Sequence, residues 1–290
     1  MSHKHCKDAP IKIAFFDIDG TLVSFKTHGM PESTRVALRE LRRNGVKIFV
    51  ASGRALFQLP DFLRNGIGDF EGFDGFLCNS GQVCLDDRGI FRMTAISPED
   101  VAAIADANDR GEFDIVYMLP DRAFTPKKGP EIVAAEEHAN VVFDLDPDTD
   151  PRECTVFQMN AFLPAHEEHR ITDIAPGVKL VRWTEDFCDI IPATGGKDLG
   201  VAAVLEHNGL SSCNAMAFGD GGNDATMLEA VGTGVAMGNA DWRAKRVADM
   251  ITTSVDDSGI YRACVALGLI DDVLDLCGDD RVVRVINPNL

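Results

Sequence analysis

Short apolar runs alternate with longer amphipathic stretches at both ends of the chain, up to residue 78 and again from residue 197. An apolar run of about four to eight residues predicts a strand buried on both faces of a parallel sheet, and apolar residues repeating every three or four positions predict a helix. This order predicts an α/β fold on a doubly wound parallel sheet with right-handed crossovers. Strands are expected at residues 11–16, 46–51, 73–78, 215–218 and 234–237, and helices at 31–44, 55–65, 197–207 and 223–231.

The middle of the chain has a different pattern, with more strands and fewer helices. A hairpin is expected at residues 82–94, and Ser97 followed by Pro98 predicts the start of a helix. Such a pattern is typical of a separate α+β unit. The prediction is a core domain of residues 1–84 and 192–290, with a second domain of residues 85–191 inserted into it. Further strands of the insertion are expected at 115–119, 156–163, 178–183 and 187–191, and helices at 131–138 and 164–171.

The composition is that of a globular protein, with 290 residues and 45% hydrophobic side chains. The chain has no apolar run long enough to span a membrane, and its polar N-terminus lacks the apolar region of a signal peptide, so we expect a cytoplasmic protein without a membrane partner. The net charge of −18 argues against a nucleic-acid partner, because the phosphates would be repelled. A small phosphorylated substrate remains compatible with this charge, since a metal ion and one or two local cations reverse the potential inside a pocket.

Eight cysteines raise the question of disulfides, but no Cys-x-x-Cys pair is present. Cys78, Cys188 and Cys213 lie in apolar, strand-like segments, so we expect reduced, buried thiols. His3, His5 and Cys6 cluster near the N-terminus and could bind a metal weakly. A frayed tail is the more common explanation for such a cluster.

Two aspartates stop the first apolar run, in the sequence DIDGTL. Asp17 and Asp19 lie at the C-terminal end of the expected strand, where open α/β sheets bind ligands, and Gly20 lets the chain turn away. Carboxylates this close repel each other unless a cation lies between them or one holds a proton. An EF-hand calcium loop would need an oxygen ligand at Thr21 followed by glycine, and Leu22 follows instead. The motif therefore indicates a metal site, acid–base chemistry, or both.

A second strand end carries a similar acidic turn. The sequence GDGGND follows the strand expected at 215–218 and contains Asp220, Asn223 and Asp224. Because the ends of parallel strands meet at one edge of a sheet, Asp17 and Asp220 are expected to converge on one hard cation. Mg²⁺ suits such a set of oxygen ligands.

Two weaker signals lie at other element boundaries. Ser52 and Gly53 follow the second expected strand, where a hydroxyl and backbone N–H groups can hold a phosphate oxygen, although Ser-Gly is also an ordinary turn pair. Lys197 begins a helix after two glycines. Since the helix dipole disfavours a cation there, this lysine is expected to reach an anion, although a surface lysine is the more common explanation.

Together these motifs resemble the haloacid dehalogenase superfamily of phosphohydrolases. The resemblance rests on DIDGT, the strand-end Ser52, Lys197 after the insertion, and GDGGND. The place of the insertion and the sequences ATGGKDLG and GVAMGNA are similar to the Cof-type subgroup, which carries a large α/β cap (type IIB) on a Rossmann-like core. SGQV stands where many relatives have an Asn-Gly-Ala turn, and the likeness ends near Asp271.

The resemblance implies a phosphatase with Mg²⁺ as cofactor, which hydrolyses small phosphorylated metabolites through an aspartyl-phosphate intermediate. It implies that Asp17 is the nucleophile and that Asp19 acts first as general acid and then as general base. The metal would be held by Asp17, the backbone carbonyl of Asp19 and Asp220, with Asp224 in support. The phosphate would be held by Ser52, Gly53, Lys197 and Asn223.

Two other functions fit parts of this pattern. A two-component receiver is also doubly wound with strand-end aspartates, but it is a much shorter module without an inserted domain. A sugar phosphomutase with a similar cap would move phosphate within a sugar, and an assay of released phosphate against isomerised sugar phosphate separates it from a phosphatase. Sugar phosphates, nucleotide-like cofactors and pyridoxal phosphate all remain candidate substrates, and no signal indicates an oligomeric state. Lys127, Lys128 and Arg182 in the insertion could meet a second substrate charge, although solvated surface is the commoner role.

Overall fold

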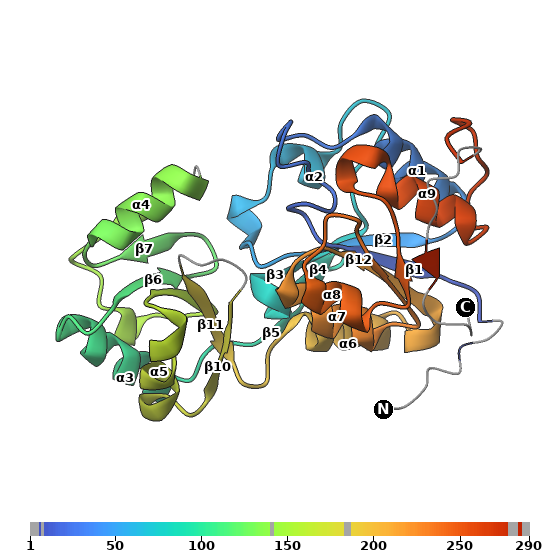
Figure 1. The fold of residues 1–290 in the computed structure, drawn as a ribbon. Helices are drawn as coiled ribbons and strands as arrows, with labels where there is room; N and C mark the ends of the chain where they lie inside the picture. Colours follow the sequence, from blue (N-terminus) through green and yellow to red (C-terminus); the bar gives the residue numbers. More distant parts are fainter. Residues whose placement is uncertain (1–5, 7–8, 140–141, 183–186, 278–283, 286–290) are drawn as a thin grey trace.

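The computed structural model describes residues 6, 9–139, 142–182, 187–277 and 284–285. The chain forms two halves, each built around its own sheet (Figure 1). The first and last thirds of the chain form one half, and the middle third forms the other. Among the described residues, no helix is both long and apolar enough to cross a membrane.

The first sheet has nine strands within the described residues, in the order β15-β14-β13-β12-β1-β2-β3-β4-β5. Its centre is parallel: β1 pairs with β12 on one side and β2 on the other, and these continue in parallel to β13 and β3. The doubly wound arrangement predicted from the sequence is confirmed. The strands are β1 (Ile13–Phe16), β2 (Lys47–Ala51), β3 (Gly75–Cys78), β4 (Val83–Asp86), β5 (Gly89–Met93), β12 (Ala215–Gly219), β13 (Thr233–Ala236), β14 (Met250–Ile251) and β15 (Arg284–Val285).

Helices cover both faces of this sheet, which explains the continuous apolar pattern of β1, whose four residues are all buried. On one face α1 packs against α9, and on the other α7 packs against both α6 and α8 (Figure 1). The helix expected at residues 55–65 is interrupted, because Pro60 ends the 3₁₀ turn Leu56–Gln58 before α2 begins. The helices are α1 (Glu32–Arg43), α2 (Asp61–Asn65), α6 (Lys197–His207), α7 (Ala225–Ala230), α8 (Trp242–Val247) and α9 (Gly259–Ala266).

The second sheet has six strands within the described residues, in the order β10-β11-β9-β6-β7-β8. Side chains of β6 alternate between its two faces: Ile115 and Tyr117 pack in one apolar cluster, whereas Val116 and Met118 pack in another with residues of α4. Both faces are therefore covered. The elements are α3 (Pro98–Asp109), β6 (Asp114–Met118), β7 (Ala123–Thr125), α4 (Pro130–Ala139), β8 (Asp144–Leu145), β9 (Gln158–Phe162), α5 (His169–Ile174), β10 (Val178–Val181) and β11 (Cys188–Pro192).

Most elements of the insertion lie close to their expected positions. Ser97 caps α3 as expected, since its hydroxyl accepts a hydrogen bond from the backbone N–H of Asp100. The helix expected at 164–171 begins later, with α5 at His169. The strand expected at 178–183 ends at Val181 as β10, and Trp183 lies outside the described residues. Strand β7 was not predicted, because its three residues are too few to display an alternating pattern.

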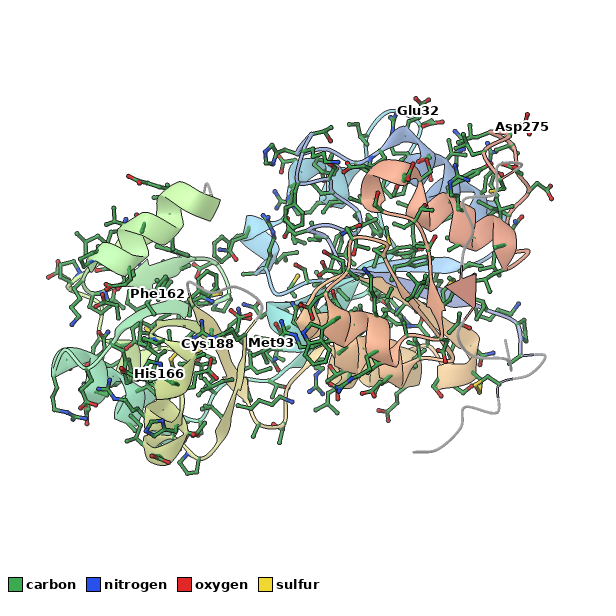
Figure 2. All side chains as sticks on the ribbon, in the orientation of Figure 1. Glu32, Met93, Phe162, His166, Cys188 and Asp275 are labelled. Carbon is green, nitrogen blue, oxygen red and sulfur yellow. A yellow bond between two sulfur atoms is a disulfide. The ribbon has the colours of Figure 1, made fainter. Side chains whose placement is uncertain are left out.

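The hairpin of β4 and β5 belongs to the first sheet, because β4 pairs antiparallel with β3. Met93, the last residue of β5, lies at the junction between the two halves, whereas Phe162 and Cys188 lie within the inserted half (Figure 2). We therefore propose that the first domain boundary follows Met93 rather than residue 84. We propose that the second boundary follows the end of β11 at Pro192, close to the position predicted from the sequence.

One pair of cysteines is cross-linked, so the expectation of reduced thiols was wrong for this pair. Cys6 and Cys213 form a disulfide, although they lie 207 residues apart in the chain. The segment before β1 runs beside the turn that precedes β12, where the Lys12 N–H donates to the carbonyl of Asn214 over 2.8 Å. This contact brings the N-terminal segment next to Cys213, a proximity that sequence spacing does not display.

The other cysteines named in the sequence analysis agree with the expectation, because Cys78 and Cys188 are buried free thiols. His3 and His5, which together with Cys6 formed the weak candidate metal cluster, lie outside the described residues.

Three consecutive residues after β3 adopt left-handed backbone conformations: Asn79 (φ 50°), Ser80 (φ 55°) and Gly81 (φ 86°). The N–H of Asn79 donates to the Arg54 carbonyl and the N–H of Ser80 donates to the Ser52 carbonyl, each over 2.9 Å. These two hydrogen bonds therefore fix the backbone of residues 52–54, which follow β2. At Ser80 this conformation costs free energy that glycine would not incur, and the Ser80 hydroxyl is buried without a hydrogen-bond partner among the described residues.

Replacing Ser80 with glycine is expected to raise the free energy of unfolding by about 1 kcal/mol, because it removes both the strained side chain and the unpaired hydroxyl. Urea denaturation followed by circular dichroism measures the change. Ser80→Ala is the matched control, since it removes the hydroxyl but keeps the strain, and it should gain less. A Ser80→Gly protein less stable than Ser80→Ala would contradict this account of the turn.

Candidate active site

The register of the parallel strands brings three of the sequence motifs to one edge of the first sheet. Phe16 in β1 lies opposite Phe218 in β12 and Val50 in β2. Asp17 directly follows Phe16, and its N–H donates to the Phe218 carbonyl over 3.0 Å. Asp220 and Ser52 follow the neighbouring strands within one or two residues, so all three side chains meet at the carboxyl ends of the strands.

Asp17, Asp220 and Asp224 form a cluster of buried carboxylates, with one oxygen from each lying within 4.8 Å of the others. Burial raises the pKa of Asp17 well above its ordinary value, and the charge of Asp224 adds to this rise. Burial and Asp224 also raise the pKa of Asp220, to about 7. The cluster therefore holds more negative charge than its surroundings neutralise.

Lys197 supplies a buried positive charge to this cluster. Its Nζ lies 2.6 Å from Asp17 Oδ1 and 2.6 Å from Asp224 Oδ1. Burial alone would lower the pKa of Lys197, but the attraction of the two carboxylates outweighs burial and raises the pKa above its usual value. The lysine is the first residue of α6, and Gly196 before it adopts φ 130°, a conformation that favours glycine.

Asp224 also shapes the loop that carries Asp220. Its second carboxylate oxygen accepts hydrogen bonds from the backbone N–H groups of Asp220, over 3.0 Å, and Gly221, over 2.9 Å. Asp220 is held in turn by Thr21, whose hydroxyl donates over 2.9 Å, and by the side-chain amide of Asn239 over 3.3 Å. Each carboxylate thus has an orientation set by the chain itself.

The approach of the two acidic loops requires glycine at position 20. Gly20 has φ 82°, and a Cβ at this position would lie 2.2 Å from a carboxylate oxygen of Asp220. A side chain here would displace the Asp220 carboxylate, which explains the glycine of DIDGT in terms of close contact as well as turning.

The Asp19 side chain points to a different partner. Arg54 donates two hydrogen bonds to the carboxylate of Asp19, from Nε and from Nη2, each 2.9 Å long. Such a bidentate pair fixes the plane of the carboxylate as well as its position. The side chain of Asp19 remains about one-third exposed, so the pair is accessible from the cavity next to it.

A cavity of about 710 Å³ lies between the two halves of the molecule, above the strand ends. Its wall on the core side includes Asp17, Asp19 and Asp220. The candidate phosphate ligands Ser52, Gly53 and Asn223 line it as well. The inserted half contributes Met118, Ala135, Val142, Phe143, Gln158, Asn160, Phe187 and Asp189.

Two of the predicted site residues, Lys197 and Asp224, are buried beside Asp17 rather than in the cavity wall. The three basic residues noted in the insertion all have local partners. Lys127 donates to the Asn108 carbonyl, Lys128 pairs with Glu136, and Arg182 pairs with Glu168.

Three residues at the site were not singled out from the sequence. Thr21 stands inside DIDGT and Asn239 inside GVAMGNA, whereas Arg54 directly follows the predicted pair Ser52 and Gly53. Their contacts with Asp220 and Asp19 join different loops and follow only from the fold.

The carboxylate cluster fits a small divalent cation. Three buried carboxylates surround one ammonium group, that of Lys197, so the cluster has excess negative charge. The side-chain atoms that could ligate an ion are carboxylate oxygens, which are hard ligands. Burial and mutual repulsion raise the pKa values of Asp17 and Asp220, and a divalent ion would offset both effects by stabilising the charged carboxylates. The residues that would hold it are Asp17, Asp220 and Asp224.

Comparisons with known proteins identify a family and several related proteins. Residues 14–264 match the model of the haloacid dehalogenase-like hydrolase family. YkrA of Bacillus subtilis, which is named as a phosphatase, is 33% identical over 89% of this chain and 98% of its own length. A phosphatase of the haloalkanoate (HAD) enzyme superfamily from Bacteroides thetaiotaomicron has a TM-score of 0.82 and 29% identity, over 91% of this chain and 97% of its own.

A second solved structure, described as a subclass IIB sugar phosphatase, has a TM-score of 0.79 and 31% identity, over 89% of this chain and all of its own. The chain therefore belongs to the haloacid dehalogenase-like hydrolase family, as a phosphatase of the type that carries a large inserted α/β cap.

Proposed function

We propose that the protein is a magnesium-dependent phosphatase that hydrolyses small phosphorylated metabolites through an aspartyl phosphate on Asp17. The geometry of Asp17 is the observation that supports this most directly. Its carboxylate lines the cavity, lies 2.6 Å from the Lys197 amine, and belongs to the cluster with Asp220 and Asp224. Positioning and charge stabilisation are what phosphoryl transfer chiefly requires.

The Mg²⁺ ligands in this proposal are Asp17, Asp220, Asp224 and the backbone carbonyl of Asp19. When bound, the ion supplies positive charge that offsets the repulsion between the substrate phosphate and the nucleophile. Ser52, Gly53 and Asn223 line the same cavity and are proposed to receive phosphate oxygens. Lys197 is proposed to orient Asp17, because its amine contacts that carboxylate directly.

The first chemical step uses Asp17 and Asp19. An oxygen of the Asp17 carboxylate forms a bond to phosphorus while the bond from phosphorus to the ester oxygen breaks. Asp19 gives a proton to the departing oxygen, so that an alcohol leaves. Arg54 is proposed to position Asp19 for this transfer, since it holds both carboxylate oxygens.

The second step reverses the proton transfer. Asp19, now a carboxylate, takes a proton from a water molecule that attacks the phosphorus of the aspartyl phosphate. The bond between phosphorus and the Asp17 oxygen breaks, which releases inorganic phosphate and restores both aspartates. The inserted domain closes one side of the cavity and is proposed to select the leaving group.

Chelation of divalent metal is expected to abolish hydrolysis of p-nitrophenyl phosphate, and added Mg²⁺ should restore it. Calcium should inhibit, because its larger and more flexible coordination shell disturbs the geometry of attack. Steady-state rates after exhaustive dialysis against a chelator measure the effect, with circular dichroism to show that the apoprotein stays folded. Full activity of a metal-free, folded protein would refute the metal assignment.

Asp17→Asn and Asp19→Asn are expected to block different steps of the reaction. Asp17→Asn removes the nucleophile, so turnover should fall by on the order of 10³-fold or more. Asp19→Asn keeps the nucleophile but loses the base of the second step, so an aryl phosphate should still phosphorylate Asp17 and the intermediate should accumulate. Rapid-quench mass spectrometry of the Asp19→Asn protein should show one phosphoryl group on Asp17. A label on another residue would mean that the nucleophile is misassigned.

Arg54→Ala is expected to slow the hydrolysis of alkyl phosphates by roughly tenfold more than that of aryl phosphates. The reason is that only the departure of a poor leaving group depends strongly on a well-placed general acid. The ratio of kcat values for glycerol phosphate and p-nitrophenyl phosphate measures this effect. Arg35→Ala, which removes a partly buried arginine of α1 outside the cavity wall, is the control and should leave the ratio unchanged. Equal losses on both substrates in Arg54→Ala would show that Arg54 does not act through Asp19.

A further inference from the structure

One face of the second sheet presents a set of hydrogen-bonding groups to the cavity. Gln158 and Asn160 lie two residues apart on β9, and Asp189 lies directly opposite Asn160 on β11. All three side chains line the cavity and are at most 2% exposed. The amide of Asn160 donates to a carboxylate oxygen of Asp189 over 2.6 Å, which fixes the orientation of both groups.

This polar face reaches the phosphate end of the cavity. A Cβ built on Gly53 would lie 3.6 Å from the second carboxylate oxygen of Asp189, so the inserted domain and the loop after β2 are in close proximity there. A leaving group attached to a phosphate beside Gly53 would therefore lie close to Asp189.

Acceptors dominate this face. The side-chain oxygen of Gln158 is buried without a hydrogen-bond partner among the described residues, and Asp189 adds a carboxylate next to it. An unpaired buried acceptor is costly, and a ligand that donates a hydrogen bond to it recovers that cost. The face is thus complementary to hydroxyl or N–H groups.

The charge of the cavity wall also disfavours a leaving group that carries an anionic group. Among the described lining residues, five carboxylates face two guanidinium groups, and both of these already have carboxylate partners, Arg54 with Asp19 and Arg243 with Asp241. The described residues that the inserted domain contributes include no lysine, arginine or histidine. A metal ion at the strand ends would serve the reacting phosphate. A second anion near Asp189 would be repelled by its carboxylate, and the described lining residues of the inserted domain offer no cationic side chain to offset this repulsion.

The remainder of this side is apolar. Phe143 and Met118 are buried in the inserted half and line the cavity together with Phe187. From the core, Phe25 is 63% exposed and also lines the cavity. A leaving group that covers these side chains would bury apolar surface on both sides of the cavity.

We propose that Asp189 and Gln158 select the leaving group: the substrate is a monophosphate ester of a neutral or cationic molecule that presents hydroxyl or N–H donors to these two residues and an apolar face to Phe143 and Phe187. Esters that carry a second phosphate or a carboxylate on the leaving group are poor substrates. This inference rests on the proposed phosphatase function and adds the chemical class of its substrate.

A matched series of aryl phosphates tests the inference on the unmodified protein. The para substituent is methyl, hydroxymethyl, aminomethyl or carboxylate, so the reacting bond stays nearly the same while the far end of the leaving group changes. The expected kcat/KM is highest for the hydroxymethyl and aminomethyl esters, and roughly tenfold lower for the carboxylate ester than for the hydroxymethyl ester. Glucose 6-phosphate should likewise exceed glucose 1,6-bisphosphate.

The variant Asp189→Asn tests whether the carboxylate of Asp189 causes the discrimination between the esters. It keeps the shape of the side chain but removes the charge, so the ratio of kcat/KM for the hydroxymethyl and carboxylate esters should fall towards one, chiefly through KM. Asp144→Asn removes an exposed carboxylate from β8 in the same sheet, outside the cavity wall, and should leave the ratio unchanged. A thermal melt of each variant accompanies the kinetics, and the series on the unmodified protein stands even where a variant does not fold.

The possible results distinguish a failure of this inference from a failure of the proposed phosphatase function. Hydrolysis of all four esters at equal kcat/KM, or a preference for the carboxylate ester, would overturn the inference while the phosphatase function stands. An equal change of the ratio in Asp189→Asn and Asp144→Asn would assign the effect to overall charge and also overturn it. Hydrolysis of none of the esters in the presence of Mg²⁺ would overturn the proposed function, and the inference with it.

Discussion

The contact of one buried ammonium group with two buried carboxylates constrains this molecule more than any other interaction. Lys197 bonds to Asp17, which lies 180 residues before it, and to Asp224, which lies 27 residues after it, so the contact joins segments from both sides of the inserted domain. Removing Lys197 would leave both carboxylates buried without their cation, which is strongly destabilising. The site therefore assembles only when the first strand, the returning helix and the second acidic loop have all docked.

The same constraint explains why the carboxylate cluster lies entirely in the core, whereas the inserted half supplies the opposite wall of the cavity. The core carries the three carboxylates of the cluster on loops that follow parallel strands. Close contacts, such as that between the backbone of Gly20 and the carboxylate of Asp220, leave little freedom there. The inserted half stands on a separate sheet with its own apolar clusters. Its cavity face can change in sequence without disturbing the strand ends, so one chemistry can serve many leaving groups.

The core and its chemistry were largely predictable from the sequence, because apolar runs that stop at aspartates reveal both a buried strand and its carboxyl end. Asp17 and Asp220 fall where that reasoning places them. The pairing of Arg54 with Asp19 was hidden, since it joins two loops whose distance no local pattern encodes. The hairpin after β3 was assigned to the insertion because alternation shows a strand but not the sheet that it joins.

The cross-link between Cys6 and Cys213 turns most of this protein into one large covalent ring. The ring encloses DIDGT, the whole insertion and Lys197, and GDGGND lies just outside it. A closed loop of this size restricts the unfolded chain and, on a polymer model, favours the folded state by about 5 kcal/mol. The stability of the enzyme is thereby tied to the redox potential of its surroundings, even though neither sulfur lies at the site of chemistry.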